Sequence, residues 1–136
     1  MNYRNRKNSP QALRFAERRR REDEAPRLSD QVPDLVSLEF QIEDRSGQTT
    51  AAAPRHIRRI VIDRAPALFL VPCSDPRCSD GEHDVTTIVM RALRAREKSF
   101  EGNDECTGNV GLGACARVMH FEATADYRAQ SHEARR

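Results

Sequence analysis

The chain has 136 residues and a formal net charge of +2, with 32% of its residues charged and only 5% aromatic. The mean hydropathy is -0.78, and no stretch approaches the roughly 20 apolar residues that a membrane-spanning helix needs. The first residues lead into arginines instead of the apolar run of a signal peptide, which predicts a cytoplasmic protein. At this length we expect one domain with a small core, which would gain from a cross-link.

An arginine-rich segment occupies residues 1–31 and is expected to form a basic arm that is largely disordered or helical only with a partner. Ser9 and Pro10 are typical of a helix start, but the apolar residues that follow cover only one turn. The side chains that could contact RNA, DNA or an acidic protein face are Arg14, Arg18, Arg19, Arg20 and Arg21. A codon bias toward arginine would give the same composition.

The pattern of a folded domain begins near Asp34. Apolar residues alternate with polar ones at Val36, Leu38, Phe40 and Ile42, which predicts a strand with one polar face. A second strand is expected at 56–63, centred on Ile60, Val61 and Ile62. The apolar run 67–71 predicts a central strand that is covered on both faces.

A helix with one apolar face is predicted next, with Asp84 as its N-cap. Its apolar positions follow helical spacing at Val85, Ile88, Val89, Ala92 and Leu93. A short strand at 99–102 and a last strand at 115–125 complete the pattern, and the third strand, the helix and the fourth strand form a right-handed βαβ crossover.

These elements predict an α+β fold over residues 34–127, followed by a polar tail at 128–136. The fold consists of a small mixed four- or five-stranded sheet, one amphipathic helix packed on it and a four-cysteine zinc site at one end.

The four cysteines form two pairs, Cys73 with Cys78 and Cys106 with Cys115, and each pair lies in a turn-like loop. Zinc favours such sets of four thiolates. A helix from 84 to 98 carries the chain away by roughly 22 Å, and an extended segment from 99 to 105 returns it by about 23 Å. Both pairs should therefore meet at one end of the sheet and bind a structural Zn²⁺. Disulfides, which need an oxidising compartment, and unrelated buried thiols are the alternatives.

His83 lies five residues after Cys78 and could replace a cysteine as a ligand. Its position beside the expected N-cap residue Asp84 favours instead a histidine on the surface of a loop.

Two short motifs invite comparison with zinc-dependent nucleobase deaminases, which use an H-x-E motif followed by P-C-x(2–4)-C. This chain contains Pro72–Cys78 and then His120, Phe121 and Glu122. The order is reversed, and the second motif lies in a predicted strand and not at a helix start, so we reject this interpretation. Four thiolates also leave zinc no open coordination position, and we expect no enzymatic activity.

The sequence favours a small zinc-stabilised binding module whose arginine arm contacts nucleic acid through phosphates, or an acidic protein partner, with no small-molecule substrate evident. One alternative is a thiol-based redox or metal-responsive regulator, in which oxidation releases the metal. Another is an enzyme whose site has no recognisable motif.

Overall fold

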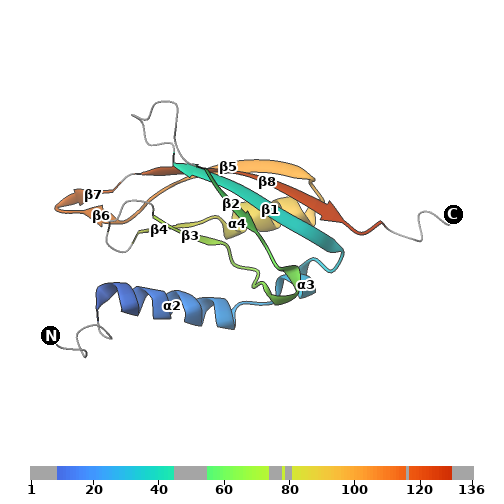
Figure 1. Ribbon diagram of the computed structural model, residues 1–136, viewed down its shortest axis with the longest axis horizontal. Coiled ribbons are helices and arrows are strands. Elements are labelled where there is room, and N and C mark those ends of the chain that lie inside the picture. The colour runs from blue at the N-terminus through green and yellow to red at the C-terminus, as the bar shows by residue number, and fades with distance from the viewer. Residues whose placement is uncertain (1–8, 45–54, 74–77, 79–80, 116, 130–136) are drawn as a thin grey trace.

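The computed structural model describes residues 9–44, 55–73, 78, 81–115 and 117–129. Its main sheet has four strands, which in spatial order are β2 (Arg55–Arg59), β1 (Leu35–Asp44), β8 (Val118–Tyr127) and β5 (Ser99–Glu105) (Figure 1). Every neighbouring pair in this sheet is antiparallel. The α+β class is therefore confirmed, but the expectation of a mixed sheet is wrong.

Alternate residues of β1 and β8 form the inner face of the sheet. The buried side chains on this face are Leu38, Phe40, Ile42, Met119, Phe121, Ala123 and Ala125. The rings of Phe40 and Phe121 meet edge to face with centroids 5.6 Å apart, a favoured aromatic geometry. The alternation in β1 thus predicted which side chains of its central part enter the core.

The alternation of buried and exposed side chains in β1 is interrupted at its first residues. The pairing with β8 shifts its register between Leu35 and Ser37, so Leu35 is buried and Val36 is 53% exposed. A shift of one residue moves side chains to the opposite face of a strand. For this reason the predicted core position of Val36 is wrong.

Helix α4 (Thr86–Arg94) lies on the inner face of the sheet (Figure 1). Val89 and Leu93 are fully buried in the same core cluster as β1 and β8, whereas Ile88 lies at the margin and is 36% exposed. Asp84 accepts a hydrogen bond from the Thr86 N–H through its Oδ1 at 3.0 Å. The N-cap residue is nevertheless Val85, so the predicted N-cap is wrong by one residue.

The apolar run after residue 66 does not enter the main sheet. Only β3 (Leu70–Pro72) is a strand, and it pairs with β4 (Glu82–Asp84) in a separate antiparallel ribbon. The Phe69 N–H donates to the Thr86 hydroxyl, and the Phe69 carbonyl accepts from Val85, so this backbone bonds to the start of α4. The predicted βαβ crossover is consequently wrong, and the run is apolar because it crosses the core.

The second predicted strand is shorter than expected. Strand β2 ends at Arg59 and is exposed along its whole length, and η1 (Ile62–Arg64) is a 3₁₀ turn. Ile60 and Ile62 pack against the margin of the core as the chain turns. Ile60 still donates its N–H to the Leu38 carbonyl of β1 at 3.0 Å, whereas Ile62 lies in the turn.

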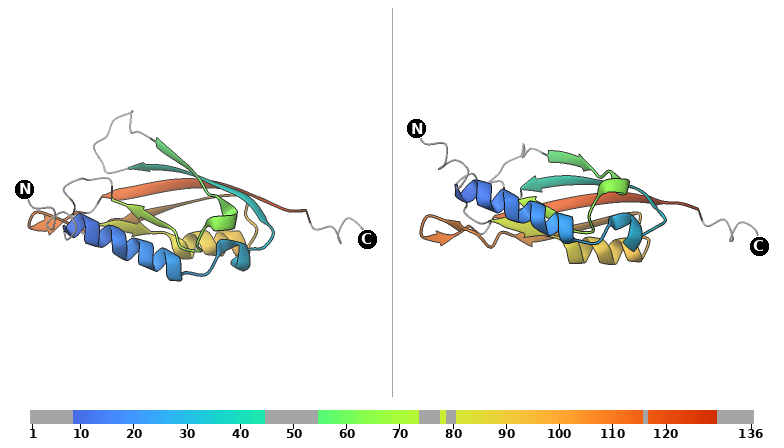
Figure 2. Two further views of the ribbon diagram at one scale, coloured as in Figure 1. Left: turned by 60° about the horizontal axis from the view of Figure 1, so that its bottom comes forward. Right: turned by 90° about the horizontal axis from the view of Figure 1, so that it is seen from below.

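Two helices precede the sheet, α2 (Pro10–Glu24) and α3 (Leu28–Gln31). Ser9 caps α2, since its hydroxyl accepts from the Ala12 N–H at 3.1 Å. Leu28 and Val32 are fully buried in the core cluster, although both precede the predicted domain start at residue 34. Helix α2 runs alongside the ribbon of β3 and β4, on the side of the main sheet that also carries α4 (Figure 2).

Parts of several predicted segments lie outside the described residues: the start of the arm at 1–8, most of the first cysteine loop at 74–77, residue 116 of the last strand and the end of the tail at 130–136. In the described part of the chain, no helix is long and apolar enough to cross a membrane.

Candidate metal centre

The four cysteines follow or flank short strands at one end of the fold. Cys73 directly follows β3, Cys78 lies between β3 and β4, and Cys106 directly follows β5. Cys115 follows a small hairpin of β6 (Asn109–Val110) and β7 (Gly113–Ala114). The return of the chain along β5 after α4 thus brings the second pair to the first, as the length of the intervening segment predicted.

The four Sγ atoms form one compact cluster, and all lie within 4.8 Å of one another. Cys73 Sγ lies 3.7 Å from Cys115 Sγ, and Cys78 Sγ lies 3.7 Å from Cys106 Sγ. A disulfide would need about 2.0 Å between the sulfurs, so none of the four cysteines forms one. A tetrahedron of sulfurs bound at about 2.3 Å from a central ion has edges of about 3.8 Å. This arrangement can hold a metal ion.

Backbone amides support the sulfurs of the second pair. The Gly108 N–H donates to Cys106 Sγ at 3.3 Å, and the Cys115 N–H donates to the Gly108 carbonyl at 2.9 Å. The Cys106 N–H donates to the Arg117 carbonyl at 2.7 Å. These bonds fix the chain around Cys106 and Cys115.

Gly81 is the residue at this site that the cysteine pattern alone did not indicate. A Cβ atom at this position would lie 2.3 Å from Cys78 Sγ and 2.7 Å from Cys106 Sγ, far inside van der Waals contact. The Gly81 carbonyl also accepts from the Cys73 N–H at 3.3 Å. The backbone of residue 81 therefore forms one wall of the cluster, and only glycine fits there. The signal in the sequence that could have indicated this residue was its position three residues after Cys78.

The thiols differ in acidity. Burial, followed by hydrogen bonding to the other three thiols, raises the pKa of Cys78. At Cys115 burial acts in the same direction, but hydrogen bonds from the Arg117 amide and from the three thiols outweigh it and lower the pKa. Cys115 therefore loses its proton more readily than Cys78, and a metal ion that binds the cluster must displace the proton of Cys78.

His83 is not a ligand in this cluster. Its side chain is buried in β4, where Nδ1 lies 2.9 Å from Asp104 Oδ2 on β5. The expected surface position is wrong because this pair connects the ribbon to the main sheet. Sequence spacing did not show the pair, since Asp104 lies in a different strand.

The arginines of the predicted contact segment lie on α2, and two of them make close ion pairs. Arg20 binds Glu17 at 2.6 Å and Glu24 at 3.0 Å within the helix. Arg21 binds Glu82 on β4 at 2.7 Å. The helix is therefore connected to the ribbon that carries the first cysteine pair.

Two other arginines of α2 have longer contacts. Arg18 lies 3.9 Å from Glu82 and is 23% exposed, and the Arg19 guanidinium lies over the Phe15 ring, 5.9 Å from its centroid. Arg14, one turn before Arg18, is partly exposed. Arg19 is exposed, so its positive charge faces solvent.

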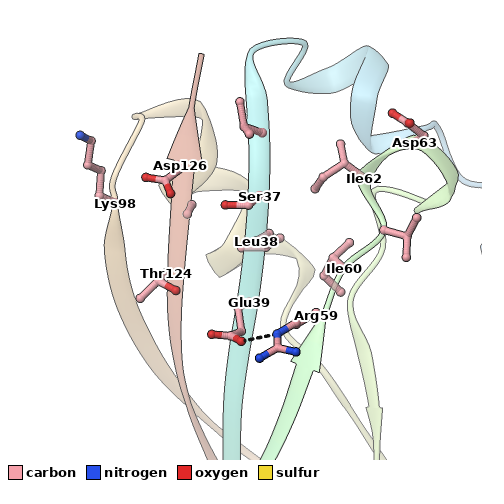
Figure 3. Close-up of a pocket in the computed structure, with 13 residues that line it drawn as sticks. Ser37, Leu38, Glu39, Arg59, Ile60, Ile62, Asp63, Lys98, Thr124 and Asp126 are labelled. Atoms are coloured by element: carbon pink, nitrogen blue, oxygen red, sulfur yellow. Dashed lines mark hydrogen bonds and ion pairs between the residues drawn. The ribbon is translucent and has the colours of Figure 1, made fainter. Parts of the chain in front are cut away.

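A hollow of about 670 Å³ lies on the main sheet near β1, β8 and the η1 turn (Figure 3). Glu39 and Arg59 form an ion pair at 2.9 Å across its floor. The described residues that line it include no cysteine or histidine. Its polar lining includes Ser37, Lys98 and Asp126.

No family model, no curated protein and no solved structure matches the chain.

Proposed function

We propose that the protein is a small binding module that a structural Zn²⁺ stabilises, with Cys73, Cys78, Cys106 and Cys115 as ligands. The observation that supports the metal most strongly is the 3.7 Å spacing within both sulfur pairs, which is the edge of a tetrahedral zinc–thiolate site. Four thiolates complete the coordination of zinc, so the ion would have no open position for catalysis.

The fold explains why a metal at this place would matter. The ribbon of β3 and β4 is separate from the main sheet, and its strands have three residues each. A two-stranded ribbon of this length is not stable alone in water. Zinc would connect it to the ends of β5 and β7, and its binding free energy would contribute directly to folding.

Elemental mass spectrometry on untagged protein, with a thiol count, tests the metal. We expect one zinc per chain and four thiols that react only after denaturation and chelation. Cys106→Ser should lose the zinc and melt at a lower temperature, whereas Thr107→Ser, at the exposed neighbouring position, should do neither. A metal-free protein with unchanged stability in Cys106→Ser would refute the proposal.

Hydrogen exchange adds a local readout. Chelation should increase amide exchange in β3, β4, β6 and β7 more than in the central pair of β1 and β8, because only the former depend on the cysteine cluster. If chelation increased amide exchange equally in all strands, the metal would not act mainly on the ribbon and the small hairpin, and this prediction would be contradicted.

For the partner, we propose a nucleic acid that the arginines of α2 contact through phosphates. The support is the concentration of arginine on one helix at the side of the ribbon. Few aromatic residues are present for base stacking, so contact with the backbone is favoured over base recognition.

The salt dependence of binding to a labelled single-stranded oligonucleotide tests this partner. In Arg14→Gln/Arg19→Gln, the slope of log affinity against log salt should fall by about 1.5, since each phosphate contact contributes about 0.7 to 0.9. The charge-matched control is Arg55→Gln/Arg59→Gln on β2. Equal slopes for the two variants would exclude α2 as the contact surface and favour an acidic protein partner.

A thiol-based redox regulator is the second candidate, which one observation favours. Cys73, Cys78 and Cys115 are partly exposed, so a small oxidant can reach them. One molecule of hydrogen peroxide would accept two electrons from each pair of thiolates, and the pair would form one disulfide. The peroxide and two protons would form two water molecules, and the metal would leave. Reversible zinc release by mild peroxide supports this candidate, and resistance to peroxide rejects it.

A further inference from the structure

A second group of metal-ligating side chains lies on the outer face of the main sheet, away from the cysteines. It consists of Glu101 on β5 with His120 and Glu122 on β8. Glu101 stands directly opposite Glu122 in the pairing of the two strands, and Asn103 stands opposite His120. One ligand atom from each of the three residues lies within 4.8 Å of the other two.

His120 is held in one orientation. It is only 4% exposed, although it lies on the outer face, and its Nδ1 lies 2.8 Å from the Asn103 Oδ1. An amide oxygen can only accept a hydrogen bond, so Nδ1 carries a proton in this contact, and in that tautomer of the neutral ring Nε2 presents its lone pair. Metal-ligating histidines are commonly oriented in this way by a hydrogen bond to the other ring nitrogen.

The buried Nε2 atom makes no hydrogen bond within the described part of the chain. It points at two carboxylates, lying 3.3 Å from Glu101 Oε1 and 3.7 Å from Glu122 Oε2. A lone pair facing two carboxylates is unfavourable, and like charges directly opposite each other destabilise a strand pair. The arrangement therefore favours a positive charge between these three groups.

We propose that Glu101, His120 and Glu122 bind a divalent first-row transition-metal ion. Imidazole nitrogen suits these ions and carboxylate oxygen accompanies it in many of their sites. Ligand atoms at about 2.1 Å from a tetrahedral ion are separated by about 3.4 Å, close to the 3.3 Å between His120 and Glu101. Glu101 and Glu122 are 66% and 49% exposed, so the ion would keep positions open to solvent, unlike an ion at the four cysteines.

The competing source of positive charge is a proton on Nε2, which would make His120 an imidazolium paired with the two glutamates. The two possibilities differ in a measurable way. A metal would broaden or shift signals at all three residues in a concentration-dependent manner, whereas a proton would leave the site unresponsive to metal.

Mn²⁺ is the probe for this site, because it prefers oxygen and nitrogen ligands and competes poorly for thiolates. The full chain, first given one equivalent of zinc, is titrated with Mn²⁺ at pH 7 and followed by NMR. We expect paramagnetic broadening centred on residues 101, 120 and 122. Glu101→Gln and Glu122→Gln should each weaken it at least about tenfold. Asp126→Asn removes a charge from the same strand four residues further on and should leave it unchanged.

Both glutamates are exposed, so their replacement does not disturb the core, and the thermal melt of each variant checks this. Absence of broadening at these residues up to about 1 mM Mn²⁺ would overturn the proposal in favour of the protonated histidine. Equal broadening in all variants would also overturn it. Neither outcome depends on the fate of the zinc at the cysteines, which elemental analysis reports separately.

Discussion

Replacing Gly81 by alanine should damage the cysteine cluster without touching any cysteine. The new Cβ would lie 2.3 Å from Cys78 Sγ, 2.7 Å from Cys106 Sγ and 2.9 Å from Cys73 Cβ. Favourable contacts between such atoms begin at about 3.5 Å, so the sulfurs or the backbone must move by about 1 Å. Overpacking of a fixed site costs about 1–3 kcal/mol, and the double collision with two ligands places this substitution at about 3 kcal/mol.

That cost corresponds to a loss of zinc affinity of about 100-fold. Competition with a chromophoric chelator measures the affinity, and the matched control is Gly113→Ala in β7. An added Cβ at Gly113 meets no atom within 4 Å, although the residue lies only two positions before Cys115. If Gly81→Ala binds zinc within about threefold of Gly113→Ala, the reasoning from this geometry is refuted.

Three further predictions concern the core and pH. Phe121→Ala, which empties a site between Phe40 and the neighbouring aromatic rings, should destabilise the fold by about 3–5 kcal/mol in urea unfolding, whereas Leu112→Ala at a fully exposed site should change it by less than about 0.5 kcal/mol. Leu28→Ala should cost about 2–5 kcal/mol because Leu28 is fully buried; a cost no larger than that of Leu13→Ala, at a position 57% exposed, would separate α3 from the core. Burial raises the pKa of Tyr127, whose hydroxyl donates to the Glu97 carbonyl at 2.7 Å. The stability that this hydroxyl contributes is fully present below the pKa of an unfolded tyrosine, about 10, and is lost as pH rises through the higher pKa of the folded state. Tyr127→Phe should therefore lose less stability than the wild type between neutral and strongly alkaline pH, and parallel pH profiles would contradict this.

Local periodicity correctly predicted the strand and the helix in which the buried side chains lie at regular intervals on one face. The alternation in β1 indicated Leu38, Phe40 and Ile42, and helical spacing indicated Val89 and Leu93, all of which are buried. The convergence of the cysteines was also predictable, because the length of a helix and of the returning strand sets where Cys106 must lie.

The errors share a different physical origin. An apolar run such as Ala67–Val71 reports burial but not hydrogen-bond partners, so it did not show that Phe69 bonds to the start of α4 and not to the sheet. Leu28 was missed because a single apolar residue in a polar segment has no periodicity. His83 and His120 are buried by partners on other strands, Asp104 and Asn103, and such long-range pairs leave no pattern in the local sequence.

Strand β5 brings these observations together. Its sequence contains Gly102, Asn103, Asp104 and two glutamates, residue types that are depleted in strands, and it lies at an edge of the sheet. Intrinsic preference therefore does not explain why this segment is extended. Its acidic side chains disfavour pairing with a second chain at the open edge. The pairing with β8 along its whole length holds it extended, and His83 at Asp104 attaches it to the ribbon of β3 and β4. In the proposed arrangement, one cation binds Glu101 near the middle of β5, and a second binds Cys106 directly after its last residue. Both ions would stabilise the extended conformation of a segment whose residue types do not favour a strand.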